Sequence, residues 1–239
     1  MNAIIIDDER LARTELNKLL KKINEIQVVG EAANAEEGIE QITKLKPDLI
    51  FLDIQMPGKN GFEMLEQLNK APYVIFTTAY DKYALKAFEV NALDYLQKPI
   101  DPKRLEEAVQ KLIKKSVITE TKNSDDSQLQ DNDRVFIKDG DKCWFINIGT
   151  IRLFESVGNY AKVYFENNRP LILKPLNFLE KRLDNKVFFR ANRKHLLNLK
   201  MIEKIEPYFN GGLLVELKGG EKVEVSRRQT AKFKEMMSL

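Results

Sequence analysis

The chain has 239 residues, enough for two ordinary domains, and its 43% hydrophobic and 31% charged residues are typical of a globular protein rather than a disordered one. A single cysteine and a single histidine exclude an intramolecular disulfide and a zinc finger. No apolar stretch reaches the ~20 residues of a transmembrane helix, and the first residues do not form a signal peptide, so we expect a cytoplasmic protein without membrane insertion.

The net charge of +3 is distributed unevenly. Residues 1–121 carry 17 Lys/Arg and 20 Asp/Glu, whereas residues 134–239 carry 21 Lys/Arg and 12 Asp/Glu. A basic half that follows an acidic half indicates a polyanionic partner for the second half. Charge alone leaves open the alternative of a solvated basic domain without such a partner.

The first half alternates short apolar runs with amphipathic helical patterns. The runs predict buried strands at residues 3–6, 28–32, 49–52, 74–77 and 94–96. The intervening patterns predict helices, one of them over residues 82–90. This alternation is typical of a parallel sheet with right-handed crossovers, in which functional groups gather at the carboxyl ends of the strands.

Polar residues stand at these strand ends. Asp7 and Asp8 end the first strand, Asp53 the third and Thr78 the fourth, and Lys98 follows the fifth. Three carboxylates at one edge repel one another unless a cation neutralises them, and Mg²⁺ prefers such oxygen ligands. A lysine and a hydroxyl supply donors for phosphoryl oxygens. The pattern therefore predicts an aspartyl-phosphate site.

Residues 119–133 are polar and acidic, with little that could be buried, and we predict a flexible linker. Beyond it, many short strands separated by turn signals indicate a mostly antiparallel β domain. These strands are expected at residues 135–137, 143–146, 151–154, 162–165, 171–173, 213–217 and 222–225. Helices are expected at 176–183 and at 227–237, the second opened by a capping box of Ser226 and Gln229.

Eight aromatic residues of the second half alternate with aliphatic ones, as in a packed β core. They are Phe136, Trp144, Phe145, Phe154, Tyr164, Phe165, Phe188 and Phe189. Aromatic residues on a sheet can also stack on single-stranded bases, so RNA binding is the rival interpretation.

Three segments of this half, residues 155–162, 188–195 and 225–229, are candidate contact loops. The second and third concentrate Arg and Lys with Asn, the residues that bind phosphates and read purine edges. Cations in the first turn of the last helix oppose its dipole, so an anionic ligand is a reasonable explanation for Arg227 and Arg228. A solvated arginine pair is the alternative.

The first half resembles the receiver domain of response regulators. The likeness lies in four separated motifs: Asp7-Asp8-Glu9, Asp53-Ile54-Gln55-Met56-Pro57 with Gly61, Thr78-Ala79, and Tyr95-Leu96-Gln97-Lys98-Pro99. It implies a flavodoxin-like, doubly wound α/β domain over residues 1–118, with five parallel strands in the order 2-1-3-4-5. It also implies a cis Lys98–Pro99 bond.

That resemblance assigns roles to the motif residues. Asp53 would accept a phosphoryl group from a sensor histidine kinase, and Mg²⁺ would be held by Asp7, Asp8, Asp53 and the backbone carbonyl of Gln55. Lys98 and Thr78 would contact the phosphoryl group and Tyr95 would turn inward, after which the receiver would form a homodimer.

Such a protein is a phosphoacceptor that loses its phosphoryl group slowly, not an enzyme. Two alternatives are an inert receiver-like fold and a phosphatase of the haloacid dehalogenase type. The second is disfavoured because no aspartate stands two positions after Asp53.

Residues 134–239 resemble the LytTR domain, a β-rich DNA-binding domain. The likeness lies in Ile151–Phe154 with Glu155, Gly158-Asn159-Tyr160, Phe188-Phe189-Arg190 with Leu196-Leu197-Asn198, and Val225-Ser226-Arg227. It implies contacts to duplex DNA from Asn159, Tyr160, Lys162, Asn192, Arg193, Lys194, Arg227 and Arg228. Many family members carry His where this chain has Asn192, so base preference cannot be transferred, and we expect His195 to pack on a strand without a special role. The two resemblances together predict a response regulator that controls transcription.

Overall fold

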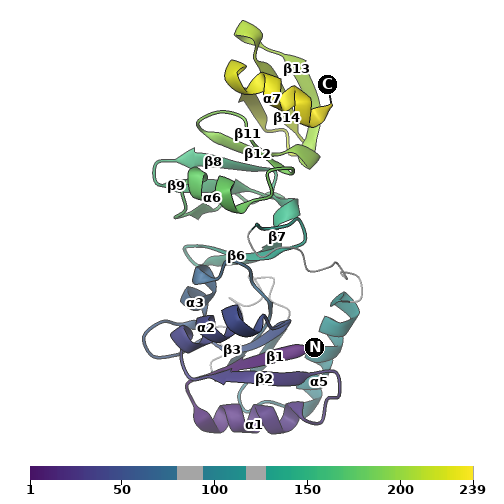
Figure 1. Cartoon of the computed structure of the whole chain (residues 1–239). Helices are drawn as coiled ribbons and strands as arrows, with labels where there is room; N and C mark the ends of the chain where they lie inside the picture. Colours follow the sequence, from purple (N-terminus) through teal and green to yellow (C-terminus); the bar gives the residue numbers. More distant parts are fainter. Residues whose placement is uncertain (80–93, 117–127, 239) are drawn as a thin grey trace. The chain divides into compact units, whose positions relative to one another are not determined.

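The structure is a computed structural model that describes residues 1–79, 94–116 and 128–238 (Figure 1). The predicted helix over 82–90 and most of the predicted linker lie outside these residues. The chain forms two compact units, one of Met1–Thr121 with Arg134–Phe145 and one of Lys122–Asp133 with Ile146–Leu239. Each is described separately.

The first unit contains a five-stranded parallel sheet in the order β2-β1-β3-β4-β5, as predicted. Its strands are almost continuous apolar runs because helices cover both faces of such a sheet. The elements are β1 (Asn2–Ile6), α1 (Arg10–Leu20), β2 (Gln27–Ala32), α2 (Ala35–Leu45), β3 (Leu49–Asp53), α3 (Gly61–Gln67), β4 (Tyr73–Thr78), β5 (Asp94–Gln97) and α5 (Pro102–Ser116).

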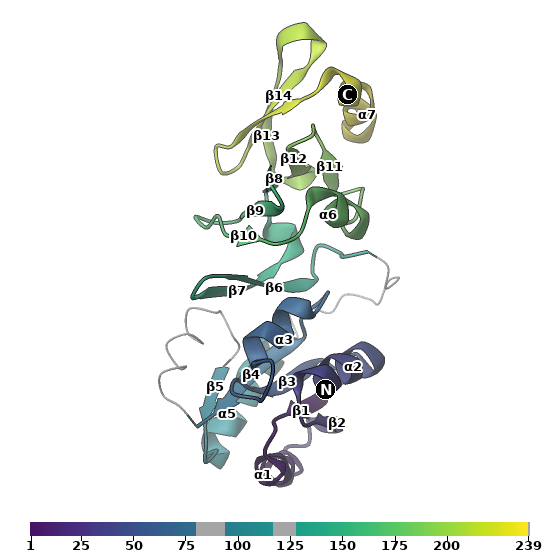
Figure 2. The ribbon, with the colours of Figure 1, turned by 90° about the vertical axis from the view of Figure 1, so that its left-hand side faces the viewer.

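The two faces of this sheet carry separate apolar cores. Helices α1 and α5 cover one face, and α2 and α3 the other (Figures 1 and 2). Leu16 and Leu112 belong to the first core, and Ile42 and Leu65 to the second. Helix α3 begins with a complete capping box, in which the Asn60 and Glu63 side chains bond each other's backbone N–H groups. This cap fixes the start of α3 close to the carboxyl end of β3.

The first unit also includes most of a two-stranded hairpin, β6 (Arg134–Asp139) and β7 (Lys142–Asn147), of which the residues from Ile146 on belong to the second unit. Its residues Phe136, Cys143 and Phe145 are buried in the α3 face of the first unit's core. Both phenylalanines were predicted to be core residues, and they are, but their partners come from the first half of the chain. The domain boundaries at 118 and 133 stay predictions.

The second unit is mostly antiparallel, as predicted. Its larger sheet has the order β10-β9-β8-β12-β11, and its smaller sheet the order β13-β14-β15. The elements are β8 (Leu153–Val157), β9 (Tyr160–Tyr164), β10 (Leu171–Ile172), α6 (Leu176–Arg182), β11 (Phe188–Arg190), β12 (His195–Asn198), β13 (Ile202–Pro207), β14 (Leu213–Leu217), β15 (Lys222–Val225) and α7 (Arg227–Met237), with short 3-10 turns at Ile148–Thr150, Leu199–Met201 and Phe209–Gly211.

One core joins the two sheets to α7. Phe233 of α7 is fully buried, and its ring lies 5.3 Å from that of Phe189. The sheets are also fastened by a bidentate ion pair, in which Arg152 donates to Glu221 over 2.9 and 2.6 Å. Except for Trp144, which is half-buried, the eight predicted core aromatic residues are buried.

The predicted capping box of α7 is wrong, because the Ser226 side chain makes no cap hydrogen bond. Strands β11, β12 and β13 were not predicted, and β8 begins two residues later than expected. Residues 128–133, at the end of the predicted linker, pack on the second unit. Leu129 N–H donates to the Arg182 carbonyl and Lys200 pairs with Asp131.

Candidate functional site

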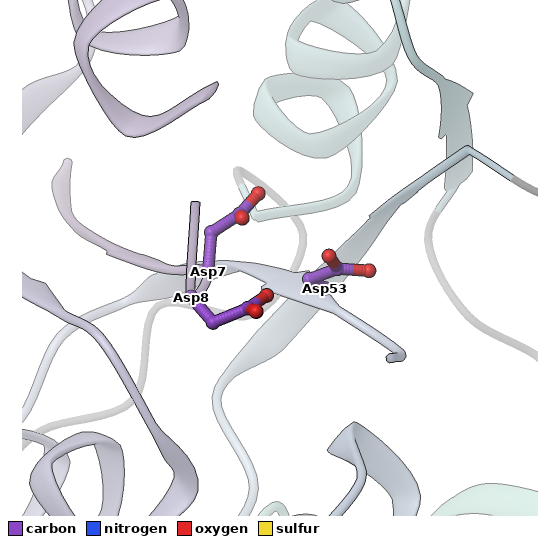
Figure 3. A group of neighbouring side chains, drawn as sticks. All are labelled: Asp7, Asp8 and Asp53. Atoms are coloured by element: carbon purple, nitrogen blue, oxygen red, sulfur yellow. The ribbon is translucent and has the colours of Figure 1, made fainter. Parts of the chain in front are cut away.

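The acidic residues of the first unit meet at the carboxyl edge of its sheet. Asp7 follows β1 and Asp53 ends β3, and both are buried, whereas Asp8 is exposed. One carboxylate oxygen from each of the three lies within 4.8 Å of the others (Figure 3). The parallel topology produces this cluster, since β1 and β3 are neighbours and end at the same edge.

Lys98 connects two of these carboxylates. Its Nζ lies 2.8 Å from Asp7 Oδ2 and 2.9 Å from Asp53 Oδ2, with Glu9 Oε2 at 3.6 Å. The Lys98 N–H donates to the Thr78 carbonyl, which extends the β4–β5 pairing to this point. The following peptide bond to Pro99 is cis, as predicted.

The pKa values of Asp7 and Lys98 follow from burial and mutual contact. Burial raises the pKa of the Asp7 carboxyl above its ordinary value, and the hydrogen bond and charge of Lys98 oppose that rise only in part. Burial lowers the pKa of the Lys98 ammonium, but its contacts with Asp7 and Asp53 outweigh burial, so that the pKa is raised. The lysine therefore stays charged between the two acids.

The other predicted receiver residues lie on β4, on β5 and in the loop after β3. Thr78 is fully buried, and its hydroxyl has no hydrogen-bond partner within the part of the chain that the structure describes. Tyr95 is half-buried on the α3 face of the core. The Gln55 N–H donates to Asp53 Oδ1 over 3.2 Å, which orients the carboxylate from the following loop.

Sequence reasoning missed Arg13. Its guanidinium donates to the backbone carbonyl of Asp7 over 2.6 Å and to that of Asp8 over 3.3 Å. Arg13 thus holds the loop that carries the two acids. Its position one turn into α1 is the only signal in the sequence, and that position does not reveal a backbone contact.

The donor set of this edge fits a hard divalent cation. Two buried carboxylates and one exposed carboxylate offer oxygen atoms only, and Lys98, which pairs with the Asp7 and Asp53 side chains, cannot neutralise all three. Mg²⁺ commonly uses one or two carboxylates and completes its shell with water and phosphate oxygens. We therefore regard Asp7, Asp8 and Asp53 as a candidate magnesium site.

The three candidate contact loops, residues 155–162, 188–195 and 225–229, are joined by backbone hydrogen bonds. The first loop is joined to the second, because the Ser156 N–H of β8 donates to the Lys194 carbonyl over 2.8 Å. The third loop is also joined to the second, because the Ser226 N–H donates to the Ala191 carbonyl over 3.0 Å. The fold therefore places the three loops next to one another, and we call these loops together the basic rim.

Most predicted contact residues on this rim are accessible. Gly158 and Asn159 form the tight turn between β8 and β9, and Gly158 has φ +61°, a conformation that favours glycine. Lys162 is half-buried opposite Glu155 on the neighbouring strand. The exposed members are Asn159, Tyr160, Arg193, Lys194, Arg227 and Arg228.

Asn192 has an internal role. Its Oδ1 accepts from the N–H groups of Lys194 and His195, and its Nδ2 donates to the Glu224 carbonyl. These bonds fold the loop between β11 and β12 and attach it to β15. The side chain that was predicted to contact DNA is thus engaged within the unit.

Arg190 also shapes this loop, and sequence reasoning assigned it no such role. Its guanidinium donates to the carbonyls of Asn192 and Arg193, each over 2.8 Å, and lies 3.2 Å from Glu180 of α6. The loop backbone is therefore held from inside while the Arg193 side chain stays exposed. Burial lowers the pKa of the half-buried His195 nearby.

The chain is similar to known proteins over both halves. Residues 3–110 match the response regulator receiver domain family, and residues 141–238 match the LytTr DNA-binding domain family. Across 249 aligned residues, covering all of both chains, it is 34% identical to the sensory transduction protein LytT of Enterococcus faecalis. It is 39% identical to an uncharacterized response regulatory protein of Vibrio cholerae, with 99% of this chain and 98% of the relative covered.

Among solved structures, the response regulatory domain of mrkE from Klebsiella pneumoniae is 32% identical, with a TM-score of 0.46. The match covers 50% of this chain and 100% of that domain. As for membranes, none of the helices in the described ranges combines the length and apolarity needed to span one.

Proposed function

Because the chain belongs to the response regulators that join a receiver domain to a LytTr DNA-binding domain, we propose that Asp53 accepts a phosphoryl group and thereby controls promoter binding by the second half. One observation carries the proposal: Asp53 lies within reach of Asp7, Asp8 and Lys98 at one sheet edge. The proposed domains are a receiver over 1–118, a linker over 119–133 and a DNA-binding domain over 134–239.

In the proposed transfer, a carboxylate oxygen of Asp53 attacks the phosphorus of a phosphohistidine on a sensor kinase. An O–P bond forms, the N–P bond breaks, and the electron pair returns to the imidazole of the kinase. Asp7, Asp8, Asp53 and the Gln55 carbonyl would hold Mg²⁺, which supplies charge neutralisation when bound. Lys98, already beside Asp53, would donate to a phosphoryl oxygen.

The Thr78 hydroxyl is buried and has no hydrogen-bond partner among the residues that the structure describes, and this supports a role of Thr78 as a switch. A phosphoryl oxygen on Asp53 would offer that hydroxyl an acceptor, and Tyr95 would turn inward on the same side of the sheet. The receiver would then form a homodimer. Slow loss of the phosphoryl group to water would reset the protein, which acts as a phosphoacceptor and not as an enzyme with turnover.

For the second half we propose binding to duplex DNA through the basic rim. Arg193 and Arg228 would read bases, and Lys162, Lys194 and Arg227 would contact phosphates. The rival function, stacking of single-stranded RNA, is disfavoured because seven of the eight candidate aromatic residues are buried. Both partners, the kinase and promoter DNA, would be met in the cytoplasm.

Phosphoryl uptake tests the first step. The full chain is incubated with acetyl phosphate and MgCl₂, and its intact mass is followed. We expect the wild type and a control variant, Glu40→Gln at an exposed position of α2, to gain one phosphoryl group each. Asp53→Asn should gain none. Equal uptake by Asp53→Asn would refute the assignment of the acceptor.

Salt-dependent DNA binding tests the second step. Removing one phosphate contact, as in Lys194→Ala, should weaken binding to all duplex sequences and lower the slope of log K against log salt by about 0.9. Arg193→Ala should relax base preference at one position and cost about 1–3 kcal/mol. Stronger binding of single-stranded RNA than of duplex DNA in the same assay would favour the rival.

A further inference from the structure

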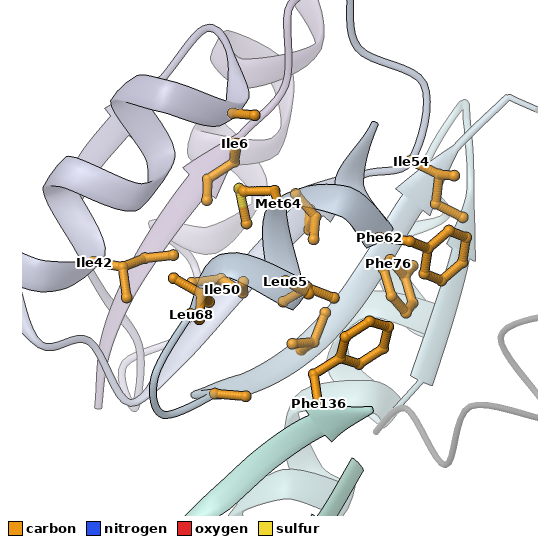
Figure 4. Packing of buried hydrophobic residues seen from close by; sticks show 14 of the residues in the cluster. Ile6, Ile42, Ile50, Ile54, Phe62, Met64, Leu65, Leu68, Phe76 and Phe136 are labelled. Carbon is orange, nitrogen blue, oxygen red and sulfur yellow. The ribbon is translucent and has the colours of Figure 1, made fainter. Parts of the chain in front are cut away.

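The hairpin formed by residues 134–145 is an integral part of the first unit's core. The Phe136 ring is stacked on that of Phe62 at 6.3 Å and lies 5.0 Å from that of Phe145. Phe62 in turn contacts Phe76 of β4 at 5.2 Å. Figure 4 shows Phe136 reaching from the hairpin to Phe62, Phe76 and Leu65. The hairpin therefore covers apolar surface that belongs to α3 and β4.

Polar contacts surround this apolar contact. The Ala71 N–H donates to the Arg134 carbonyl over 2.8 Å, and the Arg134 guanidinium lies 4.5 Å above the Tyr73 ring. Lys138 of the hairpin lies 3.6 Å from Glu66 of α3. An apolar centre with hydrogen-bonded and charged margins is the anatomy of a specific interface.

The same face is fastened directly to the phosphoacceptor strand. The Gly61 N–H donates to the Ile54 carbonyl over 2.9 Å, and a Cβ atom at Gly61 would lie 2.5 Å from the Asp53 carbonyl oxygen. Only glycine permits this approach of α3 to the backbone of Asp53. Phe62, the ring under the hairpin, is the next residue, so a displacement of the Asp53–Ile54 backbone moves the surface on which the hairpin rests.

The loop after Asp53 also faces the hairpin across a pocket of about 210 Å³. One wall is formed by Ile54, Gln55, Asn60 and Phe62, and the other by Lys138, Gly140, Asp141 and Cys143. A change in the conformation of Gln55 would therefore alter a pocket that the hairpin helps to form. Tyr95 packs against the same core cluster as Phe136.

We infer that the face of α3 and β4 is a docking surface for hairpin 134–145, and that phosphorylation of Asp53 weakens this docking. The inference deepens and rests on the proposed function. The hairpin is docked on the unmodified receiver. Packed interfaces adopt discrete arrangements, so a loop that rearranges around a phosphoryl group no longer matches the hairpin. Coupling is reciprocal, and a loosened hairpin must favour phosphorylation by the same factor.

The only cysteine of the chain reports docking. Cys143 is 3% exposed and lies on the hairpin, so a maleimide modifies it only when the hairpin opens. We expect slow labelling of the full chain and a rate increase of roughly five- to 150-fold after treatment with acetyl phosphate and MgCl₂. Asp53→Asn should show no increase. Intact mass, measured on the same samples, separates maleimide from phosphoryl adducts.

A charge exchange at the margin supplies a control that keeps the core intact. Glu66→Lys and Lys138→Glu each place like charges together, and each should raise the labelling rate of the unphosphorylated chain up to about fivefold. The double variant restores an opposite pair and should return the rate toward that of the wild type. A general loss of stability would not be rescued in this way.

The outcomes separate the two proposals. Phosphoryl uptake with an unchanged Cys143 rate would overturn the linkage and leave the proposed function in place. Labelling of the untreated wild type at the rate of a free thiol would overturn the docking itself. Absence of uptake by the wild type would overturn the proposed function, and the linkage with it.

Discussion

Removing the exposed acid of the cluster should stabilise the protein when magnesium is absent. Asp8, Asp7 and Asp53 bring carboxylate oxygens within 4.8 Å of one another. The change Asp8→Asn removes two of the three repulsive pairs and leaves the Lys98 contacts with Asp7 and Asp53 in place. On the proposed function, these acids are placed together to hold Mg²⁺, so their mutual repulsion lowers stability when the ion is absent.

The size of the effect follows from that separation. Two unit charges 4.8 Å apart interact by about 0.9 kcal/mol in water and about 3.5 kcal/mol at an effective dielectric constant of 20. Asp8 is exposed, so the lower value applies to each of its two pairs. We expect Asp8→Asn to raise the free energy of unfolding by about 1–2 kcal/mol.

Urea unfolding of the full chain, followed by circular dichroism in EDTA and in MgCl₂, measures this difference. Magnesium should stabilise the wild type by mass action and act much less on Asp8→Asn, so the advantage of the variant should shrink or reverse in MgCl₂. Glu40→Gln, which removes one exposed charge from α2, should respond to magnesium as the wild type does. A loss of stability for Asp8→Asn in EDTA, or equal stabilisation of all three proteins by magnesium, would refute the reasoning.

Three further variants test the packing around the sites. Gly61→Ala should lower the free energy of unfolding by about 1–3 kcal/mol, and the urea midpoint with it, because the added Cβ would meet the Asp53 carbonyl. Helix propensity alone predicts a higher midpoint, and that result would contradict this reasoning. Arg152 lowers the pKa of Glu221. The pair therefore stabilises the folded protein fully at pH values above the ordinary carboxyl pKa, and this stabilisation is lost as the pH falls through the lowered, folded-state pKa. Glu221→Gln should therefore flatten the acid limb of the stability profile, and an unchanged limb would argue against the pair. Asn192→Ala should loosen the second contact loop and weaken DNA binding without changing the salt slope, whereas a slope lower by about one would mean a direct phosphate contact.

The first unit was largely predictable because its sequence signals are local. Each strand is an apolar run, and the parallel order brings Asp7, Asp53, Thr78 and Lys98 to one edge. Arg13 could not be predicted in the same way. It bonds two backbone carbonyls, and a carbonyl carries no sequence signature. Arg190 was missed for the same reason, since its partners include the carbonyls of Asn192 and Arg193.

The capping box of α7 is an error from a pattern that fits a motif without forming it. Ser226 and Gln229 have the spacing of a capping box, but the Ser226 side chain makes no cap bond. Asn192 was assigned to DNA from its position in the LytTR resemblance, and this assignment stays a prediction, while the structure adds hydrogen bonds of its side chain within the second unit. A short polar side chain can serve the backbone or a ligand, and only the fold decides between the two.

The hairpin at 134–145 shows why alternation predicts burial but not the buried partner. Phe136 and Phe145 were expected in a packed β core, and they are buried together with Cys143. Nothing in their spacing distinguishes a sheet of the same half from helix α3, about 70 residues earlier in the chain. The family match to the DNA-binding domain begins at residue 141, within this hairpin. The aromatic residues of the hairpin nevertheless belong to the core of the first unit. The strand β7 thus lies within the DNA-binding family match, whereas its residues up to Phe145 belong to the unit that carries Asp53. A segment with both properties can transmit a change at Asp53 along the covalent chain, even if no other contact joins the two halves.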